Sequence, residues 1–178
     1  GKAVGLVTNH TGITRLVRKN YEVFKENPNV TLTKIFAPEH GFFGEASAGA
    51  KVDYDSTNEI GTKIISLYGK TRKPTTDMMK DLDVIIYDIQ DIGARFYTYI
   101  STLGLVMEAA GENDIEVIVL DRPNPIGGEI IEGPILDTTY KSFVGYYPIP
   151  IRYGLTVGEL SQMAIKEGWL ETNPPHLT

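Results

Sequence analysis

The chain has 178 residues, of which 42% are hydrophobic and 22% charged, a composition typical of a globular domain with a core of its own. Its formal net charge of −6 argues against sequence-independent binding to nucleic acid or to an anionic membrane, because both need a basic face. No cysteine is present, which excludes disulfides, a thiolate nucleophile and a zinc–thiolate site, and the apolar runs are strand-sized rather than long enough to span a bilayer.

Short apolar runs alternate with helical patterns along the first half of the chain. Residues 3–7, 32–37 and 64–68 predict buried strands. Residues 14–25 predict a helix with an apolar stripe of Leu16, Val17, Tyr21 and Phe24, and residues 75–80 predict a short helix capped by Thr75. Residues 42–62 are rich in Gly, Ala and Ser without periodicity, and we expect an ordered loop over the rim of the sheet.

The second half of the chain continues the alternation. Residues 84–87 and 116–120 predict buried strands, with a helix over 97–113 between them. Residues 129–150 are too rich in Gly and Pro for a helix, and residues 149–152 predict a last short strand. A final helix begins at Thr156, and Glu159 three residues later completes a capping box.

This order of elements predicts an α/β fold with a doubly wound, mostly parallel sheet and helices on both faces. No G-x-G-x-x-G follows the first strand, and no G-x-x-x-x-G-K-[ST] is present. Both absences disfavour an enzyme that uses NAD or a nucleoside triphosphate. We expect no cofactor.

Polar side chains follow four of the predicted strands. Because the carboxyl ends of parallel strands share one edge of a sheet, these groups are expected to converge there. Carboxylates, amides and imidazoles bond hydroxyl groups directionally, so a carbohydrate suits them. The groups are Asn9 and His10, Glu39 and His40, Asp88 to Asp91, and Asp121, Arg122 and Asn124.

Glu39 is the sharpest catalytic candidate. Pro38 restrains the backbone before it, and His40, Gly41 and Phe42 follow in a tight turn. A carboxyl beside phenylalanines in a closed crevice would have its pKa raised by desolvation, as a general acid at neutral pH requires. The alternative is a structural role, in which Glu39 accepts backbone N–H bonds in the loop.

Asp91 is expected near the start of the following helix, where the macrodipole favours its ionised form and suits it to act as a base or nucleophile. Simple N-capping is the alternative, and Asp88, directly at the strand end, is more typical of a structural hydrogen-bond hub. A metal site of His10, Glu39, His40 and Asp88 is weakly supported, because their spacing is not diagnostic.

Three further groups have structural and functional interpretations. Arg95 is expected to pair with Asp91 or Asp88, and Arg122 to form an ion pair or bind a substrate carboxylate. The basic loop from Lys70 to Lys73 gains interest only if the substrate is anionic. Tyr97, Tyr99, Tyr146 and Tyr147 are candidates for stacking on sugar rings or for the core.

Several long segments of the chain carry a family resemblance, namely GLVTNHTG, PEHGFFGE, SLYGKTRKPT, DVIIYDIQDIGARFYTYISTLGLVMEAA, VLDRPNPIGG, IEGPIL and SFVGYYPIPIRYGLTVGEL. Together these segments resemble the DUF1343 family, whose characterised members are bacterial exo-β-N-acetylmuramidases. The resemblance implies a Rossmann-like catalytic domain over residues 1–160, with residues 161–178 the start of a truncated C-terminal region. Most of the family's smaller C-terminal domain is then expected to be missing, and an apolar patch left where it docks would favour a homo-oligomer.

The resemblance also implies a function and a site. A glycoside hydrolase that removes terminal β-N-acetylmuramic acid from peptidoglycan fragments is expected, outside the cell or in the periplasm. Glu39 matches the family's proposed catalytic glutamate, and Asp91 is its expected partner, with no metal. The alternative is a non-catalytic module that binds cell-wall sugar. Expected substrate-binding residues are Asn9, His10, His40, Asp88, Arg95, Arg122 and Asn124.

Overall fold

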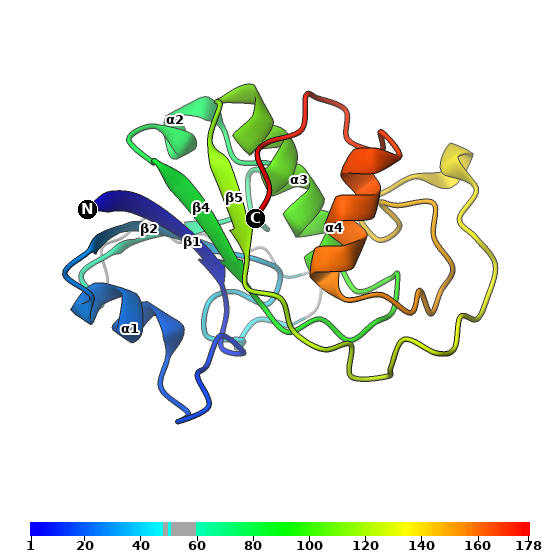
Figure 1. Ribbon diagram of the computed structural model, residues 1–178, viewed down its shortest axis with the longest axis horizontal. Helices are drawn as coiled ribbons and strands as arrows, with labels where there is room; N and C mark the ends of the chain where they lie inside the picture. Colours follow the sequence, from blue (N-terminus) through cyan, green and yellow to red (C-terminus); the bar gives the residue numbers. More distant parts are fainter. Residues whose placement is uncertain (48–49, 51–59) are drawn as a thin grey trace.

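The computed structural model describes residues 1–47, 50 and 60–178, and in this part of the chain five strands form one sheet (Figure 1). All neighbouring strands run parallel. The predicted Rossmann-like, parallel α/β fold is therefore confirmed. The strands are β1 (Lys2–Thr8), β2 (Val30–Ala37), β3 (Lys63–Ser66), β4 (Val84–Asp88) and β5 (Glu116–Val119), in the order β3-β2-β1-β4-β5.

Helices cover both faces of this sheet, as predicted. α1 (Asn20–Glu26) packs on one face, where Tyr21 and Phe24 meet the sheet. α2 (Thr76–Met79), α3 (Tyr99–Glu112) and α4 (Val157–Lys166) contribute to the larger core on the other face (Figure 1). One turn of 3-10 helix, η1 (Thr138–Tyr140), lies in the long segment between β5 and α4.

The central strand β4 shows why its sequence is apolar throughout. Side chains alternate between the faces of a strand, so Val84 and Ile86 join the core beneath α1, whereas Ile85 and Tyr87 join the core beneath α3. Every residue of β4 is buried. Burial of each such apolar side chain contributes roughly 1.5–3 kcal/mol to folding, which makes this strand the centre of both cores.

Helix α3 is buried along most of its length because the sheet lies on one side and two tyrosines of the later chain lie on the other. A Cβ at Gly104 would come within 2.6 Å of the Tyr146 ring and of the Tyr147 hydroxyl. This close approach explains a glycine in the middle of a helix despite its low helix propensity.

The predicted helix over 14–25 is wrong in its first part, since α1 begins only at Asn20. The preceding residues form a loop closed by a 2.9 Å hydrogen bond from the Thr14 N–H to the Arg18 carbonyl, and Val17 has a φ of 60°. Leu16 and Val17 are 83% and 74% exposed, so they do not belong to the apolar stripe. Apolar spacing therefore predicts a helix that is too long, because the spacing continues through the turn before Asn20.

The strand predicted over 149–152 is also wrong. Arg152 forms isolated bridges with Ala94 and Glu132 instead of joining a strand. Pro148 and Pro150 explain this difference, because proline has no N–H to donate to a sheet.

Other predicted elements agree with the structure within about two residues, the usual uncertainty of element ends. Thr75 caps α2, and Thr156 and Glu159 form the predicted capping box at α4. Most of the loop expected over residues 42–62 lies outside the described residues, namely 48–49 and 51–59, and stays a prediction.

The C-terminal residues pack on the same body as the sheet. The domain boundary predicted after residue 160 falls inside α4, where Leu160 and Ala164 both join the main core. Further on, Leu177 bridges to Val117 of β5, with a 2.9 Å bond from the Thr178 N–H to the Val117 carbonyl. That residues 161–178 begin a further region stays a prediction.

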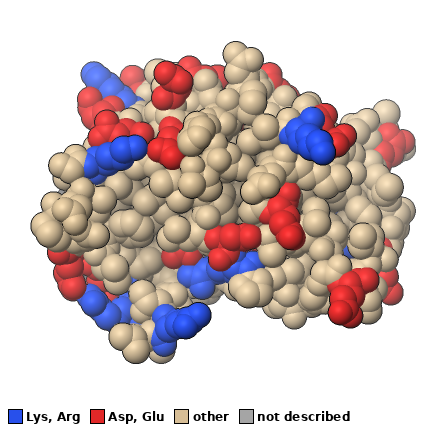
Figure 2. Space-filling view, in the orientation of Figure 1, with Lys and Arg blue, Asp and Glu red and all other residues tan. Residues whose placement is uncertain are grey.

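No helix in the described part of the chain is long and apolar enough to cross a membrane. Figure 2 shows acidic and basic side chains interspersed over one face of the molecule, without a continuous basic surface on that face.

Candidate active site

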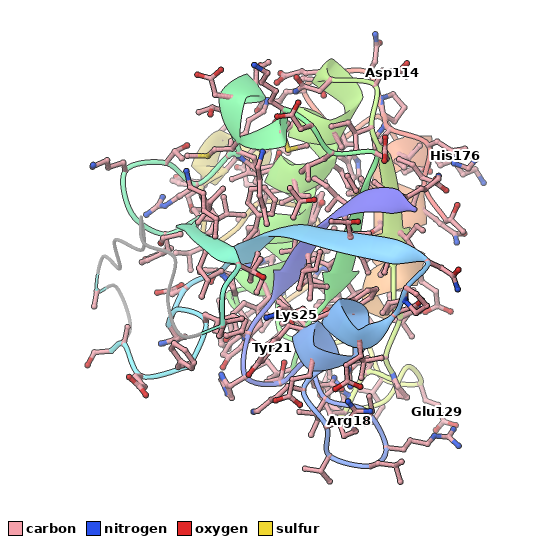
Figure 3. The ribbon with its side chains drawn as sticks, turned by 90° about the vertical axis from the view of Figure 1, so that its left-hand side faces the viewer. Arg18, Tyr21, Lys25, Asp114, Glu129 and His176 are labelled. Carbon is pink, nitrogen blue, oxygen red and sulfur yellow. The ribbon has the colours of Figure 1, made fainter. Side chains whose placement is uncertain are left out.

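The candidate site lies at the carboxyl edge of the sheet, where the strand order reverses between β1 and β4. Thr8 and Asp88 are register partners at this edge, and the Thr8 hydroxyl donates to the Asp88 carbonyl at 2.8 Å. Figure 3 shows Arg18 and Glu129, from the loops after β1 and β5, at one end of the molecule and Asp114, just before β5, at the other. The strand-end loops therefore share one end of the molecule.

Glu39 leaves β2 in the expected turn. The Gly41 N–H bonds the Pro38 carbonyl at 3.0 Å, and His40 and Gly41 both have positive φ, at 69° and 76°. This turn directs the Glu39 side chain inward, where it is 8% exposed, and its Oε2 accepts a 2.6 Å hydrogen bond from the Thr98 hydroxyl. Glu39 therefore has the buried, oriented carboxyl that the sequence predicts.

A cleft of about 220 Å³ opens beside Glu39. Its walls come from the chain after β2, β3 and β4 and from the segment before α4, and Tyr and Phe side chains make up half of its lining residues. Such walls suit the apolar face of a sugar ring, while Glu39 supplies a polar group at depth. The lining residues are Glu39, His40, Tyr68, Phe96, Tyr97, Thr98, Tyr99 and Val144.

Two tyrosines that line the cleft, Tyr68 and Tyr99, have raised pKa values. Burial, followed by a hydrogen bond to Glu39, raises the pKa of Tyr68, whereas Arg72 lowers it. Burial raises the pKa of Tyr99 to about 12, with smaller effects of Glu39 and Asp91 in the same direction and of the Asn9 amide in the other. Asn9, Glu39 and Asp91 thus all influence the pKa of Tyr99. Because both tyrosine pKa values are raised, both hydroxyls stay protonated at neutral pH.

Asp91 is a buried carboxyl, but not at a helix N-terminus as predicted. α3 begins at Tyr99, so the macrodipole argument is wrong. Asp91 Oδ2 accepts from the Gly93 N–H at 2.7 Å and from the Tyr153 hydroxyl at 2.5 Å, and Asp91 is 3% exposed. Burial raises the pKa of Asp91 despite these bonds, the opposite of the direction expected from the sequence.

Asp88 and Arg122 form a structural pair beside the cleft. Arg122 donates to Asp88 Oδ1 from Nε at 2.8 Å and from Nη2 at 2.6 Å, and Asn20 donates to Asp88 Oδ2 at 2.8 Å. Both carboxylate oxygens are therefore engaged, as the hub interpretation predicts. Asp88 and Arg122 line a separate hollow of about 440 Å³, together with Ile13 and Phe24.

Arg95 pairs with neither Asp91 nor Asp88, so that prediction is wrong. Its guanidinium donates to the carbonyls of Pro134 and Ile149, at 2.7 and 2.5 Å, and ties down the segment before α4.

Asn124 is similarly engaged, with a 2.9 Å bond from Nδ2 to the Leu155 carbonyl and a 3.1 Å bond from the Ile126 N–H to Oδ1. Both Arg95 and Asn124 hold loops rather than line the cleft, and their substrate-binding roles stay predictions.

The remaining predicted residues divide between the cleft and its surroundings. His40 lines the cleft, with Nδ1 2.8 Å from the Ala46 carbonyl. Asn9 is buried behind it and accepts from the Thr11 N–H and hydroxyl, at 2.9 and 2.6 Å. His10 is exposed and lies against Gly44. Among the described residues, no three His, Cys, Asp or Glu are placed to hold a metal ion.

Sequence reasoning missed Tyr68, Thr98 and Tyr153 as partners of the two carboxyls. Only Leu67 separates Tyr68 from the end of β3, so its position at the same edge was a usable signal. Thr98 is the N-cap residue of α3, yet its hydroxyl makes no cap and turns to Glu39 instead. Tyr153 had no local signal, because it meets Asp91 across 62 residues of chain.

Fold and site together define a class of protein: a doubly wound, parallel α/β domain with a buried carboxyl in a cleft at the carboxyl edge of its sheet. The chain belongs to the family described as exo-β-N-acetylmuramidase NamZ, N-terminal, whose model matches residues 4–177. It is 51% identical over 167 residues to the peptidoglycan β-N-acetylmuramidase NamZ of Bacillus subtilis strain 168, covering 94% of this chain and 40% of the relative.

Crystal structures of two DUF1343 family proteins from Bacteroides fragilis NCTC 9343 have the same fold. Their TM-scores are 0.90 and 0.84 at 50% and 40% identity, and the matches cover all of this chain but 44% and 46% of theirs. The resemblance to the DUF1343 family is thus confirmed, and the chain spans less than half the length of these relatives.

Proposed function

We propose that this chain carries the catalytic carboxyl of an exo-β-N-acetylmuramidase, a glycosidase that releases terminal N-acetylmuramic acid from peptidoglycan fragments. One observation carries the proposal: Glu39 is 8% exposed and held by Thr98 in a cleft with aromatic walls. Family membership and the name of the Bacillus subtilis relative support the same reaction.

In this mechanism Glu39 acts on the oxygen of the glycosidic bond. Protonated Glu39 donates its proton to the leaving oxygen as the bond from the anomeric carbon to that oxygen breaks. Water then adds to the anomeric carbon and returns a proton to Glu39, which balances the reaction. The bond from Thr98 orients the carboxyl, and Tyr68 and Tyr97 offer faces to the sugar.

Asp91 serves as the second carboxyl. Its Oδ2 is occupied by Gly93 and Tyr153, whereas its buried Oδ1 has no hydrogen-bond partner among the described residues. A buried polar atom without a partner costs free energy, so Oδ1 is suited to receive a substrate group. Because burial raises its pKa, Asp91 is better suited to orient the N-acetyl group than to attack carbon.

The test substitutes Glu39→Gln in the intact protein and follows release of an aryl β-N-acetylmuramide. Loss of the proton donor is expected to lower kcat by about 10²–10⁴-fold with an unchanged melting temperature. Glu167→Gln is the matched control, since Glu167 is exposed at the end of α4. Near-normal turnover by the Glu39 variant would remove Glu39 from the role.

The same assay separates catalysis from binding alone. If the wild-type protein binds a muramic-acid disaccharide but never releases N-acetylmuramic acid, it is a cell-wall sugar-binding module instead. Because peptidoglycan lies outside the cytoplasmic membrane, we propose that the protein acts outside the cell or in the periplasm. Recovery of the protein with the cytoplasmic fraction alone would contradict that location.

A further inference from the structure

Arg72, in the loop after β3, lies over two aromatic rings at the margin of the cleft. Its guanidinium carbon is 4.4 Å from the centre of the Phe143 ring and 5.3 Å from that of Tyr68, and the two ring centres are 5.7 Å apart. Cation–π contacts of this kind hold a guanidinium by its face. They leave the N–H groups at its edge available to a ligand.

Tyr68 connects Arg72 to the catalytic candidate. Its side chain lines the cleft, and its hydroxyl interacts with Glu39 and with Arg72. Val144, the neighbour of Phe143, lines the same cleft. The guanidinium therefore lies one tyrosine away from the carboxyl that would act on the glycosidic bond.

Arg72 also differs in its partners from three of the other arginines of the chain. Arg18, Arg122 and Arg152 each form a salt bridge with a carboxylate. The next residue, Lys73, is engaged by two glutamates of α3. No Asp or Glu in the described ranges forms a salt bridge with Arg72, so this cation at the cleft has capacity for a carboxylate from outside.

From these contacts we infer that Arg72 binds the lactyl carboxylate of N-acetylmuramic acid and makes the site select this sugar over N-acetylglucosamine. The inference rests on the proposed function, and it identifies the residue that would recognise the negative charge of the substrate. The lactyl ether is the sole difference between the two sugars. A planar guanidinium binds a carboxylate through two parallel N–H bonds. It also offsets repulsion between an anionic substrate and the acidic groups of the site.

The experiment replaces Arg72 with Gln, which keeps a planar polar head without charge, in the intact protein. Three aryl glycosides are compared: the β-N-acetylmuramide, its lactyl carboxamide and the β-N-acetylglucosaminide. For Arg72→Gln we expect kcat/KM on the muramide to fall by about 10- to 100-fold, mainly through KM, as loss of charge-assisted hydrogen bonds implies. Rates on the two uncharged substrates should not change.

Lys70→Gln is the control, because Lys70 has the same charge, lies exposed in the same loop and has no aromatic contact among the described residues. It should leave the preference for muramide intact. An equal loss on all three substrates in Arg72→Gln, or the same loss of preference in Lys70→Gln, would overturn the role of Arg72.

Calorimetric binding of N-acetylmuramic acid separates this inference from the proposed function. Binding by the wild type that weakens in Arg72→Gln, with no turnover of any glycoside, would support Arg72 and reject the hydrolase. If the wild type hydrolyses the muramide and Arg72→Gln does so with the same kinetics, the hydrolase is supported and the role of Arg72 is rejected. Neither binding nor turnover by the wild type would reject both.

Discussion

At the scale of single residues, the candidate site contains two buried carboxyls, and a hydroxyl group donates a hydrogen bond to each of them. Thr98 donates to Glu39, and Tyr153 donates to Asp91. The carboxyl-bearing residues are 8% and 3% exposed, so their orientation depends on protein groups rather than on water. Such preorganisation is what a catalytic carboxyl needs, and it makes the two donors separately testable.

Thr98→Val removes the donor to Glu39 while keeping the shape of the side chain. Because one hydrogen bond to a charged group contributes about 1.5–3 kcal/mol, we expect kcat for the aryl muramide to fall by about 10- to 100-fold with little change in KM. The Thr98 hydroxyl does not cap α3, so any loss of stability should come from the lost bond to the buried Glu39 carboxyl, at about 1–3 kcal/mol. Steady-state kinetics and thermal melting measure both effects.

Thr102→Val is the control for that variant. It removes the hydroxyl that bonds the Thr98 carbonyl at 3.2 Å, on the same helix but without contact to Glu39. Its kcat should match the wild type. An equal fall in both variants would assign the effect to α3 as a whole instead.

Asp91→Asn should stabilise the protein at neutral pH while lowering its activity. Burial raises the pKa of Asp91, so the folded state favours the protonated form more than the unfolded chain does. The stability that this preference contributes is complete below the unfolded pKa and is lost as pH rises through the folded pKa. A neutral amide avoids the loss, so the variant's advantage should shrink on acidification.

Urea unfolding at pH 7 and at successively lower pH checks this sign. Asp114→Asn is the control, because Asp114 is exposed and has a φ of 54°, which Asn tolerates equally well. A destabilised Asp91→Asn at pH 7 would contradict the prediction.

At the scale of elements, the starts of α2 and α4 follow from their capping residues, whereas the N-cap side chain of α3 bonds another residue. Thr75 and Thr156 accept from backbone N–H groups, and α2 and α4 begin where the sequence predicts. α1 has no side-chain cap, and its start was misplaced. The Thr98 hydroxyl at the start of α3 donates to Glu39 instead of capping the helix, a departure from local rules that is typical of functional sites.

Thr156→Ala should destabilise the protein by about 1 kcal/mol, because it removes the capping box of α4. It also removes the 2.5 Å bond from the Thr156 hydroxyl to Asp121. Denaturant unfolding of this variant, compared with Thr139→Ala on the exposed η1 turn, measures the effect. Equal stability of the two variants would show that the cap contributes nothing.

At the scale of the whole molecule, one buried carboxylate joins three distant segments. Glu108 of α3 is 1% exposed, and it binds Lys73 at 3.2 Å, the Tyr146 hydroxyl and the Glu171 N–H at 3.0 Å. These partners lie in the loop after β3, the segment before α4 and the C-terminal tail. Glu108 therefore holds these three segments against α3, and the segment before α4 supplies part of the cleft wall.

Glu108→Ala should lower the free energy of unfolding by about 3 kcal/mol or more, since it leaves buried partners without their acceptor. Glu112→Ala is the control, because Glu112 pairs with the same lysine at 2.8 Å but its side chain is 45% exposed. It should cost about 1 kcal/mol or less. Chemical denaturation of both variants measures the difference, and equal costs would refute the role of burial.

The sequence by itself determined the five strands of the sheet, their parallel direction, and the position of Glu39 and other acidic residues at the carboxyl ends of the strands. It could do so because apolar runs, caps and turns act over a few neighbouring residues. It misplaced the start of α1 and the strand at 149–152, where a closed loop and two prolines outweighed apolar spacing. Only the tertiary structure decided that Thr98 and Tyr153 hold the carboxyls and that Arg72 rests on Phe143. Those contacts join residues 59, 62 and 71 positions apart, and such pairs are set by how the layers pack, not by any local pattern.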